Sequence, residues 1–589
     1  MNSTRNKLLI ICLILACAAL FVHFIGLKFD YLKDRRQGHR TTLIPSRRGD
    51  ILDRNGKLIA TSIKLQDLYF YTAGLSRKEA AFVMSKIEKV LAAYGADKQE
   101  LVLLRRDFKK AFARKGAFCV IKDLIDNSIY RQIIDSAGSA GGSSIKDIRG
   151  KVYLTDKYKR YYPFSSVYGT LTGYISKQGN AAYGIEESLD GKLAGIDGEM
   201  ITSASPYIKK GRWGRTNWLK EPQNGNDVRL SLDSVIQEYT YRVLRDAVTT
   251  HRAKGACAIV METATGKVRA FASLPSFDPN NYFDHEISDY MNIGVSNLYE
   301  PGSIMKPLVI GFILEQSRGG SAPVLRKGDK FYCENGKYRM ENGRLIEDVE
   351  KLKTLSVLEI IAHSSNIGVT KIMQKYEAAG DKLEFYRFMI SILNLQRSLN
   401  VPLTNHTKGS ILDYGKWIKN YSMISICMGY EVSSSPLNFV TAFNVIPAGG
   451  KLLRPLFLEN EKPEIYTKDL FSSGTLDFLN EALKEVVRTG TAKKIGGSGL
   501  ELAGKTGTAR KYDPELKTYS KEKYIASFIG YFPATAPVYT IGVFIDEPKS
   551  RIYGSEVAAP VFRSIAERVN AYYLNRKTYY TKSEEADER

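Results

Sequence analysis

The chain has 589 residues, of which 44% are hydrophobic and 25% are charged. A folded protein of this length divides into about two to four domains, and this composition excludes a largely disordered chain. The net charge of +22 raises the question of nucleic acid as a partner. Because the basic residues are dispersed and no nucleic-acid-binding motif accompanies them, we expect no nucleic acid partner.

Residues 8–27 form an uninterrupted run without a formal charge. At a rise of about 1.5 Å per residue, a helix of this length crosses a bilayer. We therefore expect a cytoplasmic tail at residues 1–7 and a single-pass anchor in the cytoplasmic (inner) membrane. Because large downstream domains are translocated largely regardless of flanking charge, we place the rest of the chain on the outer, periplasmic side. A cleaved signal peptide and lipidation at Cys17 are the alternatives.

The cysteines lie far apart in the sequence and match no metal-ligand spacing. They are Cys12, Cys17, Cys119, Cys257, Cys333 and Cys427. Structural zinc sites use closely spaced cysteine and histidine pairs, which are missing here. We expect no metal and no cofactor.

Residues 28–222 form the first expected domain outside the membrane. Asn55-Gly56 lies between two hydrophobic pairs, and this dipeptide is typical of a tight hairpin turn. From residue 75 to residue 135, charged and hydrophobic residues alternate at helical spacing. Residues 138–144 are rich in glycine and serine and predict a loop.

The second expected domain covers residues 223–575. Its pattern predicts a strand at 228–232, a helix at 234–248, a hairpin of strands at 256–261 and 267–273, and a mainly helical region to about residue 445. Three strands at 502–510, 525–532 and 538–545 and a closing amphipathic helix at 557–574 follow, and residues 576–589 are expected to form a flexible tail. This order predicts an α+β fold in which helices cover an antiparallel sheet.

The first candidate for chemistry is Ser303, three residues ahead of Lys306. Pro307 is tolerated only in the first turn of a helix, so the hydrophobic helix that follows must begin just upstream and Ser303 must lie at its start. Lys306 then lies on the same face as Ser303. A neutral lysine can accept the proton of a serine hydroxyl, provided that burial or a second cation lowers its pKa from about 10.4 to about 7.

Taken alone, this pattern is weak. Ser143 and Lys146 have the same spacing in a predicted loop, and most such pairs are ordinary surface residues. Two further motifs are needed to support a catalytic interpretation.

The second motif is Ser364-Ser365-Asn366, within the helical region. Ser364 could relay a proton to a leaving amine, and the Asn366 amide could hold a substrate carbonyl. Taken singly, a helix-capping role is more common for such residues.

The third motif is Lys505-Thr506-Gly507-Thr508, on a predicted strand. Lys505 can bind a carboxylate as a point charge, and the Thr506 and Thr508 hydroxyls can donate to the same group. Gly507 would allow a substrate backbone to approach closely.

The three motifs together, in this order, are the signature of class A β-lactamases and penicillin-binding proteins. The middle position of the second motif varies, with Ser365 in place of aspartate. The chain resembles class B penicillin-binding proteins over nearly its whole length, because further segments look like motifs of that class. These segments are 48–56, 183–186, 193–195, 265–266, 275–280, 448–450 and 557–562.

The resemblance implies a monofunctional peptidoglycan D,D-transpeptidase, with residues 28–222 as an extended, β-rich, non-catalytic pedestal of the dimerisation type and 223–575 as the transpeptidase domain. Ser303 would attack the penultimate D-Ala of a stem peptide, and Lys306 would accept its proton. Ser364 would pass a proton to the leaving amine, and the Asn366 amide would hold a substrate carbonyl. Backbone N–H groups of Ser303 and Thr508 would stabilise the oxyanion. Lys505, Thr506, Gly507 and Thr508 would hold the terminal carboxylate.

The resemblance further implies covalent inhibition by β-lactams and a division-type role, with a septal glycosyltransferase and other division proteins as partners. The alternatives are an elongation-type transpeptidase and a division scaffold with secondary catalysis. A serine β-lactamase would need an efficient base for deacylation, and we find no convincing Glu-x-x-x-Asn element in the helical region. We therefore expect β-lactams to stay bound to Ser303.

Overall fold

The computed structural model describes residues 40–124, 128–138, 151–202, 218–318, 323–395, 399–497, 499–513, 515 and 517–587. These residues form two compact units. The smaller unit draws on Met1–Gly49, Ser62–Arg160 and Lys192–Asn226, and the larger unit on Asp50–Thr61, Tyr161–Gly191 and Asp227–Arg589. The predicted anchor at residues 8–27 lies outside the described residues, among which no helix is long and apolar enough to span a membrane.

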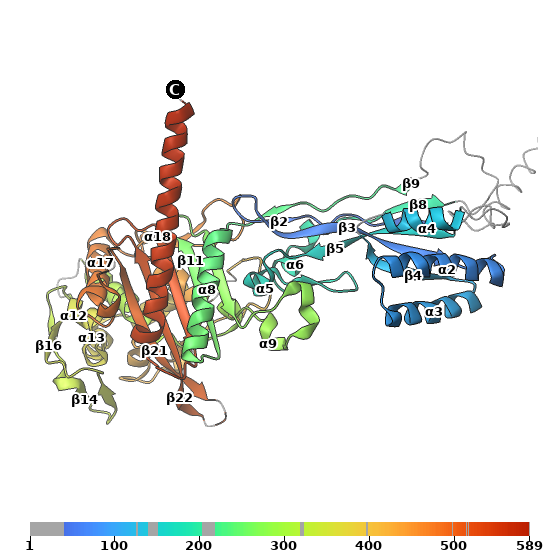
Figure 1. The fold of residues 1–589 in the computed structure, drawn as a ribbon. Helices are drawn as coiled ribbons and strands as arrows, with labels where there is room; N and C mark the ends of the chain where they lie inside the picture. The colour runs from blue at the N-terminus through green and yellow to red at the C-terminus, as the bar shows by residue number, and fades with distance from the viewer. Residues whose placement is uncertain are drawn as a thin grey trace, which may run out of the picture. The chain divides into compact units, whose positions relative to one another are not determined.

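The smaller unit contains both strands and helices (Figure 1). β1 (Arg40–Ile44) pairs antiparallel with β8 (Gly198–Thr202), which pairs with β9 (Trp218–Lys220). β3 (Leu58–Tyr71) pairs with β4 (Ala117–Leu124) and with β5 (Val152–Tyr161). The helices are α2 (Arg77–Ala93), α3 (Lys98–Ala113) and α4 (Ser128–Gly138). The unit thus combines strands with helices.

The segment 75–135, which we expected to be helical, is interrupted by β4. α2 and α3 begin with capping boxes, Ser76 with Glu79 and Asp97 with Glu100, which satisfy otherwise unpaired backbone N–H groups. Between α3 and α4 the hydrophobic run of β4 pairs with β3 instead of forming a helix. Hydrophobic residues of the helices, β3 and β5 close a core that includes Leu68, Phe70, Val83, Ile87, Ile133 and Val152.

The larger unit is built on an antiparallel sheet, as predicted, and this sheet has five strands (Figure 1). Its strand order is β12 (Val268–Leu274), β11 (Gly255–Glu262), β23 (Tyr539–Asp546), β22 (Thr518–Phe532) and β21 (Ala503–Asp513). The predicted hairpin at Ala264-Thr265-Gly266 joins β11 to β12. β21, which carries the third motif, is therefore an edge strand of the sheet.

Helices cover the sheet. α8 (Ser234–His251) and α18 (Gly554–Asp587) contact each other and the strands of one side, as Figure 1 shows. The helical region includes α11 (Met305–Gln316), α12 (Val357–Ala362), α13 (Asn366–Ala379), α14 (Lys382–Ile392), α15 (Ser422–Cys427), α16 (Pro436–Phe443) and α17 (Ser473–Arg488). α11 is buried almost throughout, because its residues are hydrophobic on every face.

The closing helix is longer than predicted. We expected it to end near residue 574 and to be followed by a flexible tail, but α18 continues to Asp587. No glycine or proline follows Pro560 before that residue, so the sequence contains no strong helix breaker.

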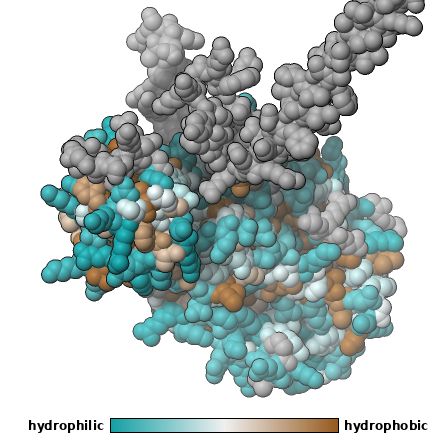
Figure 2. All heavy atoms as spheres, turned by 90° about the vertical axis from the view of Figure 1, so that its right-hand side faces the viewer, coloured by the Kyte–Doolittle hydropathy of each residue, from teal (hydrophilic) through white to brown (hydrophobic). Residues whose placement is uncertain are grey.

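Figure 2 shows hydrophobic residues in small, separated groups among hydrophilic ones on the face that it presents. Such scattered groups are normal on a folded surface and need no partner to cover them.

Candidate active site

Ser303 lies in a tight turn at the start of the nucleophile-bearing helix. Residues Gly302–Ile304 form a 3-10 turn that runs into α11, and Pro307 is the third residue of that helix. The position that Pro307 predicted for Ser303 is therefore confirmed. Ser303 is half-buried, whereas Ile304 and Met305 are fully buried.

Main-chain contacts fix this turn. Gly302 has a left-handed φ of +59°, and its N–H donates to the Gly429 carbonyl at 3.2 Å. A Cβ on Gly429 would lie 2.1 Å from the Gly302 oxygen, which leaves no room for a side chain. The turn that presents Ser303 therefore requires glycine at both positions.

Lys306 points into the interior, where it joins the first motif to the second. Its Nζ donates to the Ser364 carbonyl oxygen at 2.6 Å and to Asn366 Oδ1 at 2.7 Å, and it lies 3.3 Å from Ser364 Oγ. The side chain is fully buried. None of these three hydrogen bonds reaches Ser303, so in this resting state Lys306 is held by the second motif.

Burial lowers the pKa of Lys306 from 10.5 to about 8, although the negative charge of Asp348 opposes the shift. At neutral pH about a tenth of the lysine is then uncharged. This shift has the direction that a general base at this position needs.

Asp348 holds the second motif in place. Its carboxylate accepts from Ser365 Oγ at 2.6 Å, from the Asn366 N–H and from the Ile367 N–H at 3.1 Å. Ser365 is the N-cap of α13, and its hydroxyl also accepts from the Gly368 N–H. The variant serine in the middle of the motif therefore has the capping role that its sequence context suggested.

Ser364 has a left-handed backbone conformation, with φ of +58°. This conformation is uncommon for a residue with a side chain and costs about 1–2 kcal/mol. With this conformation, both the carbonyl and the hydroxyl group of Ser364 contact Lys306 Nζ.

The third motif lies on β21, next to the Ser303 turn. A Cβ on Gly507 would lie 2.9 Å from Ile304 Cγ1 and from the Pro301 oxygen, and closer still to Ser527 Oγ. The missing side chain of Gly507 therefore allows β21 to pack closely against the turn that carries Ser303. This differs from our expectation that its missing side chain makes room for a substrate.

Lys505 is the second fully buried lysine of the site. Its Nζ donates to the Thr506 carbonyl at 3.1 Å and lies 3.4 Å from Thr506 Oγ1. Burial lowers the pKa of Lys505 well below its usual value, and the charge of Lys306 lowers it further.

The threonines of the third motif are also held by neighbours. Thr506 Oγ1 lies 2.9 Å from Thr491 Oγ1. Thr508 Oγ1 accepts from the Gly554 N–H at 3.0 Å, which leaves its own proton free to be donated. The structure thus brings the residues of all three motifs together, while their individual catalytic and binding roles stay predictions.

The carboxylate of Glu300 lies directly before the turn that carries Ser303. Glu300 Oε1 accepts from the Glu431 N–H at 2.7 Å and from the Tyr519 hydroxyl at 2.9 Å. Burial raises the pKa of Glu300 to about 6. The sequence gave no reason to link Glu300 with Tyr519, because the two residues lie more than two hundred positions apart.

Sequence reasoning also missed Asp348, Gly429 and Thr491. None of them belongs to a recognisable motif, and each reaches the site only through the fold. The closest to a sequence signal is Gly429, between Met428 and Tyr430. This glycine looks like any other loop glycine in the sequence. Among the described residues, no group of three or more His, Cys, Asp or Glu could hold a metal ion.

Two family models match the chain. The penicillin binding protein transpeptidase domain matches residues 256–567, and the penicillin-binding protein dimerisation domain matches residues 43–230. The fold and the three motifs thus define a serine acyltransferase-type protein with a second, dimerisation-type domain. The chain belongs to the penicillin-binding protein family, and its relatives identify it as a class B, division-type member.

The similar proteins are cell-wall transpeptidases by name. The chain is 27% identical to the probable peptidoglycan D,D-transpeptidase PenA of Neisseria gonorrhoeae, covering 94% of this chain and 90% of that one. It is 28% identical to the peptidoglycan D,D-transpeptidase FtsI of Escherichia coli, covering 70% of this chain and 67% of that one.

Solved structures share the fold. Penicillin binding protein 3 of Mycobacterium tuberculosis, complexed with aztreonam, matches with a TM-score of 0.64 at 21% identity, covering 91% of this chain and 97% of that one. Penicillin binding protein 2X of Streptococcus thermophilus matches with a TM-score of 0.70 at 19% identity, covering 89% and 79%.

Proposed function

We propose that the protein is a peptidoglycan D,D-transpeptidase that cross-links stem peptides through a Ser303 acyl-enzyme. The observation that carries this proposal is the buried Lys306, one helical turn from Ser303 and hydrogen-bonded to Ser364 and Asn366. A buried amine with a lowered pKa can remove the serine proton at neutral pH. The names of the relatives, which are D,D-transpeptidases, support the same substrate class.

In the proposed first step, Ser303 Oγ attacks the carbonyl carbon of the penultimate D-Ala while Lys306 takes its proton. The terminal D-Ala leaves as an amine and receives a proton through Ser364. In the second step, an amine of another stem peptide attacks the ester, and Ser303 regains its proton. β-Lactams would acylate the same hydroxyl and stay bound.

Lys505 and the threonines of β21 would bind the terminal carboxylate. A carboxylate beside the buried Lys505 would favour its charged form and offset the effect of burial. Among the described residues no strand pairs with the outer side of β21, along which an extended peptide can align.

We further propose that residues 8–27 anchor the protein in the cytoplasmic membrane with the catalytic domain outside. A role in septal cell-wall synthesis, next to a glycosyltransferase and other division proteins, follows from the likeness to FtsI. Imaging of a fluorescent fusion in dividing cells tests the septal role, and side-wall labelling would favour an elongation role instead.

Labelling with a fluorescent penicillin tests the chemistry. We expect one covalent adduct per chain, mapped by mass spectrometry to the peptide that contains Ser303, and no adduct on Ser303→Ala. Ser143→Ala, at the second serine with a lysine three residues on, is the matched control and should label fully. An adduct elsewhere, or rapid turnover of penicillin, would contradict the proposal.

A further inference from the structure

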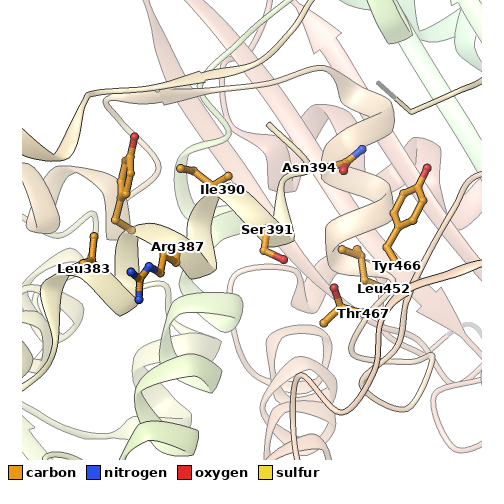
Figure 3. Close-up of a pocket in the computed structure, with 9 residues that line it drawn as sticks. Leu383, Arg387, Ile390, Ser391, Asn394, Leu452, Tyr466 and Thr467 are labelled. Atoms are coloured by element: carbon orange, nitrogen blue, oxygen red, sulfur yellow. The ribbon is translucent and has the colours of Figure 1, made fainter. Parts of the chain in front are cut away.

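Two pockets of similar volume lie in the larger unit. The first, of about 370 Å³, lies beside α14, and Figure 3 shows Arg387 of that helix among its lining residues. None of its lining residues belongs to the three motifs. The second, of about 350 Å³, is lined by Glu300, Ala509 and Tyr519, among others. It therefore borders both the chain that leads into the Ser303 turn and β21, the strand that carries the third motif.

The chain that leads into this turn runs antiparallel to a second segment, which follows α15. Tyr299 and Ser434 exchange two backbone hydrogen bonds, of 3.1 and 3.2 Å, and the Gly302 N–H donates to the Gly429 carbonyl at 3.2 Å. Two residues lie between the paired positions of the first segment, and four lie between those of the second. Backbone hydrogen bonds therefore cannot continue in register between these two points.

Glu300 connects the two segments where the backbone does not. Its neighbour Pro301 has no N–H to donate. Glu300 Oε1 accepts from the Glu431 N–H at 2.7 Å, so a carboxylate oxygen takes the place of a backbone carbonyl. A hydrogen bond to a charged acceptor is about twice as strong as one between neutral groups. This contact therefore holds the two segments together directly before the turn.

The same oxygen also binds the β21–β22 hairpin. The Tyr519 hydroxyl, near the start of β22, donates to Glu300 Oε1 at 2.9 Å. Tyr519 pairs with Tyr512 of β21, and its ring packs edge-on against Tyr430 of the second segment at 5.3 Å between ring centroids. One carboxylate oxygen therefore joins three parts of the fold, namely the chain before the turn, the segment after α15 and the hairpin.

β21 meets the turn at a second place along the same hairpin. A Cβ on Gly302 would lie 3.1 Å from the Thr508 carbonyl oxygen, so the turn packs directly against the third motif. Thr508 pairs with Ala526, whereas Tyr512 pairs with Tyr519, so the two contacts lie on successive parts of the hairpin. Two attachments hold the turn and the strand in place more firmly than one would, as the support of a catalytic constellation requires.

We propose that Glu300 is a positioning residue, which fixes the spacing between the Ser303 and Thr508 N–H groups. It does so by binding Glu431 and Tyr519 with one oxygen. The proposal rests on the proposed function, because these two N–H groups are the ones that the family resemblance assigns to the oxyanion. A donor of this kind contributes about 10²–10³ in rate, and it does so only at about 2.7–3.1 Å from the oxyanion. Glu300 acts through the turn and the hairpin and does not contact the substrate.

Acylation by penicillin tests this role when stopped-flow kinetics separate the limiting rate from the initial binding. Glu300→Ala should lower the limiting rate about 10–100-fold, because one displaced oxyanion donor costs about 10²–10³ at most. The initial binding constant should stay within about twofold, since the lost interaction is made only in the transition state. Glu300→Gln keeps an acceptor oxygen and should restore the rate to within about threefold of the unaltered protein. Tyr519→Phe removes one of the two donors and should have an intermediate effect.

Two controls lose similar hydrogen bonds elsewhere in the larger unit. Glu315 Oε1, at the far end of α11, accepts from the Ser472 N–H at 2.9 Å and from its hydroxyl at 2.6 Å, so Glu315→Ala is the control for the alanine variant. The Tyr531 hydroxyl, on β22, donates to Asn480 Oδ1 at 2.7 Å, so Tyr531→Phe is the control for the phenylalanine variant. Both controls should be acylated at the unaltered rate, and urea unfolding compares the stability of all the variants.

The carbonyl group of the acyl-enzyme reports on the oxyanion site directly. Hydrogen bonds to a carbonyl oxygen lower its stretching frequency. Infrared difference spectra of the protein acylated with penicillin, isotope-labelled at the β-lactam carbonyl, therefore detect the two N–H groups. In Glu300→Ala the labelled ester band should shift to higher frequency, and in Glu300→Gln it should stay near that of the unaltered protein. A loss of stability alone would not move this band.

A limiting rate for Glu300→Ala equal to that of Glu315→Ala, with an unshifted carbonyl band, would overturn the positioning role. So would an equal loss in Glu300→Gln, because the charge rather than the hydrogen bonds would then matter. If Glu300→Ala does not fold, Tyr519→Phe decides, since an unchanged rate and band there would break the link through the hairpin. A failure of penicillin to label Ser303 in the unaltered protein would instead contradict the proposed function.

Discussion

The start of α11 and the start of β21 each bury one lysine completely, yet the two lysines have different surroundings. Lys306 donates to two acceptors of the second motif. Burial lowers its pKa to about 8, and the negative charge of Asp348 opposes the shift. Lys505 donates to the Thr506 carbonyl, and burial together with the charge of Lys306 lowers its pKa well below the usual value. Burial alone therefore does not decide what a lysine does, because its neighbours set its charge.

This difference suggests two separate roles. Lys306 keeps a pKa near the working pH and can both accept and return a proton. Burial and the charge of Lys306 lower the pKa of Lys505, and a bound carboxylate would favour its charged form.

Replacing the two lysines in turn should give the largest effect. Lys306→Met should lower the limiting rate of acylation by penicillin about 10²–10⁴-fold, because it removes the general base while keeping the volume. Lys505→Met should mainly weaken the initial binding. Stopped-flow acylation over a range of penicillin concentrations separates rate from affinity, with the exposed Lys375→Met of α13 as the control. A loss of affinity alone for Lys306→Met would contradict the assigned roles.

The dependence on pH is the next largest effect. Because only the neutral form of Lys306 is a base, acylation should rise about tenfold per pH unit below 8 and level off above it. The same shift affects stability. Since the unfolded chain holds this proton more tightly, the free energy of unfolding contributed by Lys306 should increase as pH rises from about 8 towards 10.5. Urea unfolding at several pH values, with Lys306→Met as the reference, measures this slope.

Gly507→Ala should disturb both the Ser303 turn at the start of α11 and β21. The added methyl would press on Pro301, Ile304 and Ser527, and overpacking of this kind costs about 1–3 kcal/mol. We expect a lower midpoint of urea unfolding and slower acylation. Gly191→Ala is the control, because a Cβ there meets nothing within 4 Å. Normal acylation of Gly507→Ala would show that the contact between strand and turn is not needed.

Asp348→Asn should have the smallest effect. It removes a negative charge from the N-terminus of α13, which costs about 0.3–1 kcal/mol, and it removes the charge that raises the pKa of Lys306. The pH profile of acylation should therefore move to lower pH. Asp381→Asn, at the N-cap of α14, removes a comparable charge from a helix N-terminus away from the site and should leave the profile unchanged.

The sequence predicted much of this arrangement. Pro307 located the start of the helix, and strand periodicity located β21 and β23 within a few residues but found only the second half of β22. It did not predict β4, because that strand forms by pairing with β3 rather than by its local pattern. It did not find Asp348 or Gly429 either, since both act through contacts between distant parts of the chain, which no local spacing encodes.

The turn around Ser303 is clamped by backbone rather than by side chains, since the Gly302 N–H is bonded to the Gly429 carbonyl. The amide hydrogen of Gly302 should therefore exchange with deuterium only when the whole larger unit unfolds. Heating should then abolish penicillin labelling in a single step with global melting, with no earlier loss of the nucleophile.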